Sequence, residues 1–224
     1  MRLSTSASVA VLALLASPVM AQEDGAGDVQ IKLLGTAVLP DGKITDVTVD
    51  PGLPVGTQTK ANDNVVPTVA IEYFFTNNVS VETICCMTQH DVDGTTGLPG
   101  AELVSNARLI PATLTAKYHF DVGAAKPYVG AGATYFLWVS DKPGAATTPA
   151  PFNITDTDLS DEFGFVLQAG IDIPVSDKGL GISLDAKRYF VDTTARWYAG
   201  NTLVIETEHK LDPWVLSAGV SYRF

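Results

Sequence analysis

Alternation of apolar and polar side chains with a period of two recurs eight times along this chain. Successive side chains of a β-strand point to opposite faces, so each run predicts a strand with one apolar and one polar face. In the first run Val29, Ile31 and Leu33 share one face, and Gln30 and Lys32 share the other. The predicted strands span residues 28–38, 65–75, 79–87, 110–120, 127–138, 163–173, 180–189 and 214–224.

The connections between these runs alternate between long and short. The long ones are residues 39–64, 88–107, 139–161 and 191–212, and the short ones include the turn Thr76-Asn77-Asn78. A soluble β-sandwich also alternates along its strands, but this asymmetry is typical of outer-membrane barrels, which have even strand numbers, short periplasmic turns and long extracellular loops. We therefore predict an all-β, eight-stranded, antiparallel, up-and-down transmembrane β-barrel with both termini on the periplasmic side.

The N-terminus resembles an export signal. Arg2 precedes the apolar run Ala7 to Leu15, and small residues precede a cut after Ala21. We predict a signal peptide at residues 1–21 and a barrel at residues 22–224 in the outer membrane of a Gram-negative bacterium; an N-terminal helix is the alternative. No later segment has the roughly 18 unbroken apolar residues that a membrane helix needs.

Charge placement agrees with a barrel. The whole chain has a formal net charge of −11, and most of its acids fall in the four long connections, where water can solvate them. Such acidity argues against nucleic acid as a partner, because binding a phosphate backbone depends on clustered Lys and Arg. The terminal aromatic residues Tyr222 and Phe224 are the predicted membrane-insertion signature, and the barrel-assembly machinery and outer-membrane lipid are the predicted partners.

The predicted inward faces carry charges of both signs. Eight strands enclose a lumen just wide enough for side chains to fill it, so these charges can pair across the interior and argue against a wide aqueous pore. The predicted charge network consists of Lys32, Glu72, Glu82, Lys117, Asp172, Asp185, Lys187 and Arg223. The inward apolar residues, which either line a path for a solute or simply pack, are Leu34, Phe74, Ile84, Phe136 and Trp138.

Neither the cysteines nor the histidines form a recognisable chemical motif. Cys85 and Cys86 are neighbours, so their side chains point to opposite faces of a strand, and we predict that they are structural. His90 and His209 fall in long connections beside acids, which leaves a rim site open, but no nucleophile motif accompanies them. We predict no enzymatic activity, no metal and no cofactor.

Several segments together resemble the OmpW family of small outer-membrane proteins. They are residues 27–32, 38–40, 67–78, 90–92, 110–120, 126–132, 163–172, 212–214 and 222–224. The resemblance implies a narrow, partly apolar lumen that passes small hydrophobic molecules across the outer membrane, with a sideways exit into lipid as an open question. The chain departs from the family at Cys85-Cys86 and in the Pro- and Thr-rich stretch 143–151.

Two functions stay open at the level of the sequence. One is passage of small hydrophobic solutes through the lumen, which needs an apolar lining. The other is a structural or surface-interaction barrel whose extracellular loops act as a receptor or adhesion surface, since loops often carry binding functions.

Overall fold

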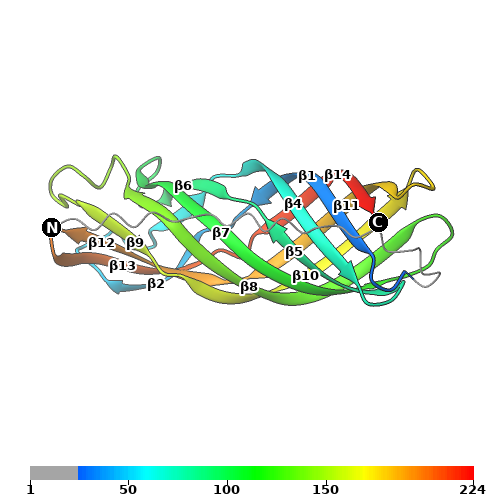
Figure 1. Ribbon diagram of the computed structural model, residues 1–224. Coiled ribbons are helices and arrows are strands. Elements are labelled where there is room, and N and C mark those ends of the chain that lie inside the picture. The colour runs from blue at the N-terminus through cyan, green and yellow to red at the C-terminus, as the bar shows by residue number, and fades with distance from the viewer. Residues whose placement is uncertain (1–24) are drawn as a thin grey trace, which may run out of the picture.

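Eight strands close into an antiparallel barrel in the computed structural model, which describes residues 25–224. The predicted signal peptide, with its cut after Ala21, lies outside the described residues. Around the barrel the order is β7-β5-β4-β1-β14-β11-β10-β8, and β8 pairs back with β7 (Figure 1). The barrel strands are β1 (Val29–Leu39), β4 (Asn64–Phe74), β5 (Val79–Cys85), β7 (Glu102–His119), β8 (Lys126–Pro143), β10 (Glu162–Pro174), β11 (Leu180–Phe190) and β14 (Trp214–Arg223).

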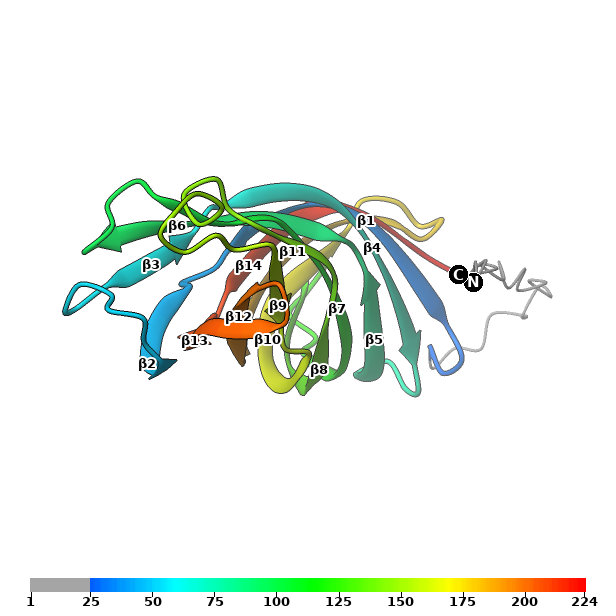
Figure 2. The same cartoon turned by 90° about the vertical axis from the view of Figure 1, so that its left-hand side faces the viewer.

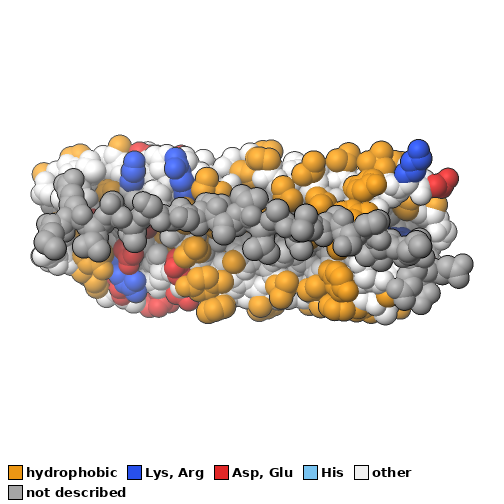
Figure 3. Space-filling view, viewed as in Figure 1, with side chains coloured by type: hydrophobic (Ala, Val, Ile, Leu, Met, Phe, Trp, Pro, Cys, Tyr) orange, Lys and Arg blue, Asp and Glu red, His pale blue; other side chains and the backbone are white. Residues whose placement is uncertain are grey.

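Burial follows the predicted two-residue period. On β4, Ala70, Glu72 and Phe74 point inward and are at most 1% exposed, whereas Ile71 and Tyr73 are more than 40% exposed on the outer surface. Hydrophobic side chains form a broad band on the face in Figure 3, and charged side chains gather toward the two ends. The outer apolar face matches a lipid environment. Among the described residues, no helix has the length and apolar character to cross a membrane.

The four long connections, which the sequence analysis treats as loops, contain six further strands. These are β2 (Lys43–Val49), β3 (Gln58–Ala61), β6 (Thr88–Thr96), β9 (Asp156–Leu159), β12 (Asp192–Ala199) and β13 (Thr202–Lys210). Strands β2, β13, β12 and β9 form a separate sheet, while β3 and β6 extend the barrel sheet beside β7. Together with the adjoining ends of β7 and β8 they form the extracellular cap, at the left of Figure 1 and facing the viewer in Figure 2.

Strand β7 passes from the cap into the barrel, and its pattern changes on the way. In the barrel its inward residues are polar, as at Thr115 and Lys117, whereas in the cap they are apolar, as at Val104 and Ala107. Between the two halves a β-bulge at Asn106, which has φ of 55°, shifts the register against β8. Asn is one of the few residues that adopts a positive φ readily. The molecule therefore encloses polar groups inside the barrel and apolar groups inside the cap.

The hydrogen-bond ladder between β4 and its neighbour stops partway along the strand. Pairing of β4 with β5 ends at Val69 opposite Cys85, and Cys86 and Met87 form a break before β6 begins. Above the break the side chain of Asn64 donates to the Gln89 carbonyl at 2.8 Å. Within residues 25–224, Val65–Thr68 have no ladder partner on this side, and we call this interruption the ladder gap.

Candidate functional site

Seven charged side chains from six of the eight barrel strands meet inside the barrel. Lys32 lies 2.9 Å from Glu72 and 3.2 Å from Asp172, and Lys117 lies within 2.9 Å of both Glu72 and Glu82. All of these side chains are at most 10% exposed. The ion-pair cluster consists of Lys32, Lys117, Lys187, Glu72, Glu82, Asp172 and Asp185.

Lys187 joins the cluster from β11 and carries it toward the cap. Its ammonium group lies 2.7 Å from Asp185 and 3.2 Å from Glu82. The cluster therefore opposes three ammonium groups to four carboxylates. Buried charges of this kind are tolerated only when they are paired and their remaining hydrogen-bonding capacity is satisfied.

Neutral polar side chains supply that remaining capacity. Gln168 donates to both Glu82 and Asp185, and the Tyr128 hydroxyl donates to Asp185 at 2.7 Å. The ring of Tyr128 also lies under the Lys117 ammonium, 3.7 Å from the ring centroid. Gly170 leaves room for this ring, because a Cβ there would approach the Tyr128 hydroxyl oxygen to 2.3 Å.

The histidine of the barrel belongs to the same cluster. Nε2 of His119 lies 2.7 Å from Glu72 and 3.1 Å from the hydroxyl of Ser80. His119, Tyr128 and Gln168 are not among the predicted site residues, although each occupies an inward position in the alternation of its strand. Their inward alternation was the signal that could have found them.

Arg223 lies apart from the other charges predicted to form the network. Its guanidinium group pairs with Asp28 at 2.8 Å and stacks over the ring of Phe74 at 3.7 Å, close to the periplasmic end. Arg223 is the last strand residue of β14, so its side chain is at the end of the lumen instead of its middle. The prediction that Arg223 belongs to one charge network across the lumen was wrong.

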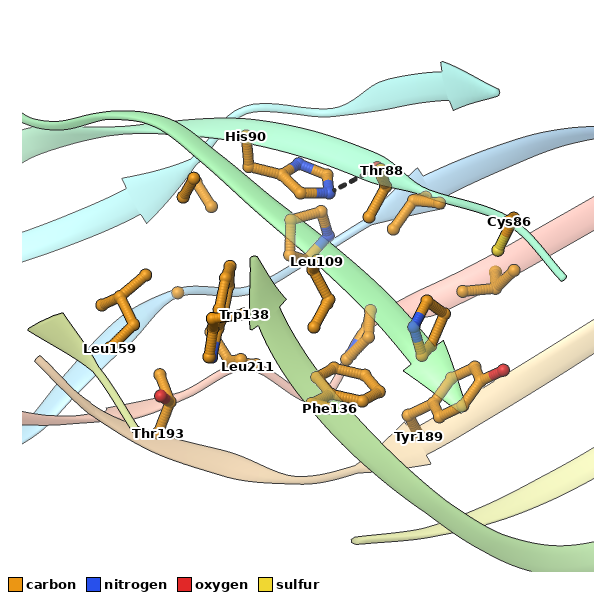
Figure 4. A pocket seen from close by; sticks show the side chains of 18 of the residues that line it. Cys86, Thr88, His90, Leu109, Phe136, Trp138, Leu159, Tyr189, Thr193 and Leu211 are labelled. Atoms are coloured by element: carbon orange, nitrogen blue, oxygen red, sulfur yellow. Dashed lines mark hydrogen bonds between the residues drawn. The ribbon is translucent and has the colours of Figure 1, made fainter. Parts of the chain in front are cut away.

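Above the ion-pair cluster the lumen is apolar and contains a cavity of about 70 Å³, which we call the lumen cavity. Ile84, Phe136 and Trp138, three of the five predicted apolar residues, line it. Figure 4 shows their neighbours converging on it from several strands, with Phe136 beside Tyr189 and Trp138 among Leu109, Leu159 and Leu211. Lys187 also lines the cavity, so the ion-pair cluster closes its inner end.

The other two predicted apolar residues do not line the lumen cavity. Leu34 and Phe74 point inward and are buried, but Phe74 lies at the periplasmic end, where its ring centroid is 5.1 Å from that of His119. A period of two tells which face a side chain occupies but not how high along the barrel it lies. Trp138 is the residue that links the two halves, because it packs against the hydrophobic clusters of both the barrel and the cap.

The two histidines of the long connections lie at the cap end of the lumen cavity instead of forming a catalytic rim site. Nε2 of His90 lies 2.9 Å from the Thr88 hydroxyl, and Nε2 of His209 lies 2.6 Å from that of Thr207. Burial lowers the pKa of both side chains, to about 4 for His209. Both imidazoles are therefore neutral at pH 7. Among residues 25–224, no three His, Cys, Asp or Glu side chains group in a way that could hold a metal ion.

The cysteines lie at the ladder gap, and both are free thiols. Cys85 is exposed on the outer face, and the half-buried Cys86 lines the lumen cavity with Thr68 across the gap. Their side chains point to opposite faces, as the sequence predicted. The lumen cavity thus reaches the wall of the barrel where the wall has no hydrogen-bond ladder.

Aromatic side chains form pairs on the outer surface near the periplasmic ends of the strands. Tyr222 and Phe224 are each about half exposed, and their ring centroids lie 5.9 Å apart. Equivalent pairs occur at Tyr73–Phe75 and Tyr118–Phe120. Aromatic girdles at the membrane interfaces are typical of transmembrane barrels. The role of Tyr222 and Phe224 in membrane insertion stays a prediction.

Comparison with known proteins gives consistent matches over nearly the whole described chain. A model of the OmpW family matches residues 25–224. The outer-membrane protein y4mB of Sinorhizobium fredii is 36% identical over 87% of this chain and 79% of its own length. Outer membrane protein W of Vibrio cholerae is 26% identical over 98% of this chain and 99% of its own length.

Solved structures show the same fold. The outer membrane protein OprG of Pseudomonas aeruginosa superposes with a TM-score of 0.77 at 23% identity, over 89% of this chain and 96% of that chain. The family consists of membrane barrels that are not enzymes. On the strength of the family match, the relatives and the closed eight-stranded barrel, this chain belongs to the OmpW family as an integral barrel of the outer membrane.

Proposed function

We propose that this barrel passes small hydrophobic molecules across the outer membrane without passing ions freely. The observation that carries the proposal is an apolar lumen cavity directly above a buried ion-pair cluster that fills the barrel. The free energy of an apolar molecule falls when it leaves water for such a lining. A hydrated ion, by contrast, would have to lose its water in the apolar half and then cross the cluster.

The ladder gap is the proposed exit. The ion-pair cluster blocks the straight path to the periplasm, so a molecule in the lumen cavity has a shorter route sideways past Thr68 and Cys86. Side-chain packing alone separates the cavity from lipid there, because the strands on either side share no ladder hydrogen bonds over Val65–Thr68 within the described chain. An apolar solute would then move from the lumen into the membrane without meeting the buried charges.

The test replaces the indole ring of Trp138, which packs against the hydrophobic clusters of both the barrel and the cap. Trp138→Ala widens the lumen cavity, and Trp214→Ala is the matched control because Trp214 is 49% exposed on the outer surface. We expect Trp138→Ala to raise hydrocarbon flux by about tenfold if the ring contributes about 1.4 kcal/mol to the barrier. Flux is measured into vesicles with a lipopolysaccharide outer leaflet, because plain lipid is itself permeable to hydrocarbons.

Equal flux in both variants and in the parent would contradict the role of Trp138, and parent flux no higher than that of protein-free vesicles would overturn the proposal. That result would favour the alternative function, a structural barrel whose cap acts as a receptor or adhesion surface. Binding of a surface partner, measured on the same two variants, would then be the property to follow.

A further inference from the structure

A second cavity lies in the extracellular cap, outside the membrane. It has a volume of about 180 Å³ and is lined by residues from all four long connections. We call it the cap cavity; it is lined by Ile44, Leu53, Thr57, Thr59, Leu98, Ala101, Leu103, Ala146, Thr147, Phe152, Trp197, Ile205 and Thr207. We propose that the cap cavity is a binding site for a compact, uncharged hydrocarbon, such as a molecule with a single aromatic ring.

The cap cavity is separate from the lumen cavity, although only one layer of side chains divides them. Trp197 and Thr207 line the cap cavity, whereas His209 lines the lumen cavity. The rings of Trp197 and His209 have centroids 6.4 Å apart, and Thr207 holds His209 through a hydrogen bond of 2.6 Å. Trp197 is itself fixed, because its Nε1 donates to the Leu103 carbonyl at 3.0 Å.

The chemistry of the lining indicates the class of ligand. Each of the four threonine hydroxyls is hydrogen-bonded within the protein: Thr57 to the Pro54 carbonyl, Thr59 to the Gly42 carbonyl, Thr147 to the Gly144 carbonyl and Thr207 to His209. No lining residue carries a charge. A polar ligand would leave water and find few partners, which costs free energy, so the site selects against polar molecules.

The size of the cap cavity sets the size of the ligand. An engineered apolar cavity of about 150 Å³ in another protein stays dry and binds benzene or xenon. The cap cavity is slightly larger than that. A single ring therefore fits.

The cap cavity is also placed to take up a ligand from outside the cell. Of the lining residues, Trp197, Ile205 and Thr207 are buried, Phe152 and Leu53 are half-buried and Ala146 is exposed. Ala146 is both a lining residue and exposed to water, so a ligand would enter past it. Binding in the cap cavity does not require the solute to cross the membrane. Only transfer of the bound solute onward to the lumen cavity would rest on the proposed function.

Isoleucine methyl groups allow a direct test with benzene as the probe. Ile44 and Ile205 line the cap cavity, Ile84 lines the lumen cavity and Ile71 faces lipid. In methyl-labelled protein in lipid nanodiscs, we expect nuclear Overhauser effects from benzene to Ile44 and Ile205. Ile71 reports the benzene that is dissolved in lipid, and Ile84 reports benzene in the lumen.

Two neighbouring alanines provide a matched pair of variants. Ala146→Leu places a larger side chain at the cavity, and Ala145→Leu makes the same change at an exposed position that does not line it. We expect Ala146→Leu to weaken benzene binding at Ile44 and Ile205 by at least tenfold and Ala145→Leu to leave it unchanged. Ala101 also lines the cavity, and Ala101→Leu should repeat the effect of Ala146→Leu.

Absence of benzene contacts at Ile44 and Ile205, or equal contacts in the three alanine variants and the parent, would overturn the inference. Failure of the proposed function looks different, since hydrocarbon flux would then be absent while benzene still contacted the cap methyls. Loss of flux in Ala146→Leu but not in Ala145→Leu would further show that the two cavities act in sequence.

Discussion

Lys117 has two carboxylate partners within 2.9 Å and a side chain that is fully buried. Removing its charge leaves Glu72 and Glu82 short of a counter-ion in a place where water cannot replace it. We expect Lys117→Met to lower the free energy of unfolding by about 3–5 kcal/mol. Urea unfolding of the protein in lipid vesicles measures the change.

An exposed lysine provides the comparison for that prediction. Lys43 pairs with Asp41 at 3.1 Å, but its side chain is 64% exposed. Exposed pairs contribute about 0–1 kcal/mol, so Lys43→Met should change the stability little. Similar losses in the two variants would contradict an energetic role for the ion-pair cluster.

His209 makes the stability of the cap depend on pH. Burial lowers its pKa to about 4, below the usual value of about 6.5, so the unfolded chain binds a proton in this range that the folded cap excludes. The neutral His209 therefore contributes fully to the free energy of unfolding above a pH of about 6.5. This contribution, up to about 3 kcal/mol in total, is lost as the pH falls toward 4. Burial lowers the pKa of His90 as well, which adds a change of the same sign.

The measurement uses the fluorescence of Trp197 in a Trp138→Phe, Trp214→Phe background, since the chain has three tryptophans. We expect the urea midpoint of the cap to fall between pH 7 and pH 5, and His209→Gln to reduce this fall. An equal fall in both proteins would show that His209 does not contribute.

Among the elements, the eight barrel strands could be predicted because lipid outside and polar groups inside give each strand strong alternation. In the cap the contrast is reversed and less regular, since the polar Thr193 lies on the buried face of β12. On β12 the outward residues Thr194 and Arg196 are polar and the inward residues Ala195 and Trp197 are apolar, the reverse of the barrel pattern. The bulge at Asn106 hid the start of β7 for a related reason, because it shifts the phase of the alternation.

The ladder gap is an element whose function can be tested by closing it. Val69 lies opposite Cys85, so Thr68 and Cys86 are the next positions along the two strands. In a Cys85→Ser background, Thr68→Cys should form a disulfide with Cys86 under an added oxidant. We expect hydrocarbon flux to fall to the rate of protein-free vesicles and to recover after reduction.

Cys85→Ser alone, treated with the same oxidant and reductant, is the control for that experiment. Complete cross-linking with unchanged flux would mean that the solute does not leave through the gap. The straight route past the ion-pair cluster would then need to be reconsidered.

For the molecule as a whole, sequence patterns give the face of each side chain but not its height in the barrel or its partner. Lys32 and Asp172 are 140 residues apart and meet only because β1 and β10 lie in one closed barrel. Seven of the eight predicted inward charges form one cluster for this reason, while Arg223 lies at the end of the lumen. The cap cavity could not be predicted, because its walls come from all four long connections.

The whole molecule therefore combines an apolar entrance with a charged and filled barrel. Apolar side chains line both the cap cavity and the lumen cavity, and the ion-pair cluster lies below them. A wide aqueous pore would need a hydrated entrance and an open barrel, and this arrangement has neither. Hydrocarbon flux and ionic conductance should consequently be separable properties of the protein.

Both properties can be measured in one reconstitution with a lipopolysaccharide outer leaflet. We expect hydrocarbon flux well above that of protein-free membranes, together with ionic conductance close to the protein-free level. High ionic conductance without a gain in hydrocarbon flux would contradict the proposed function.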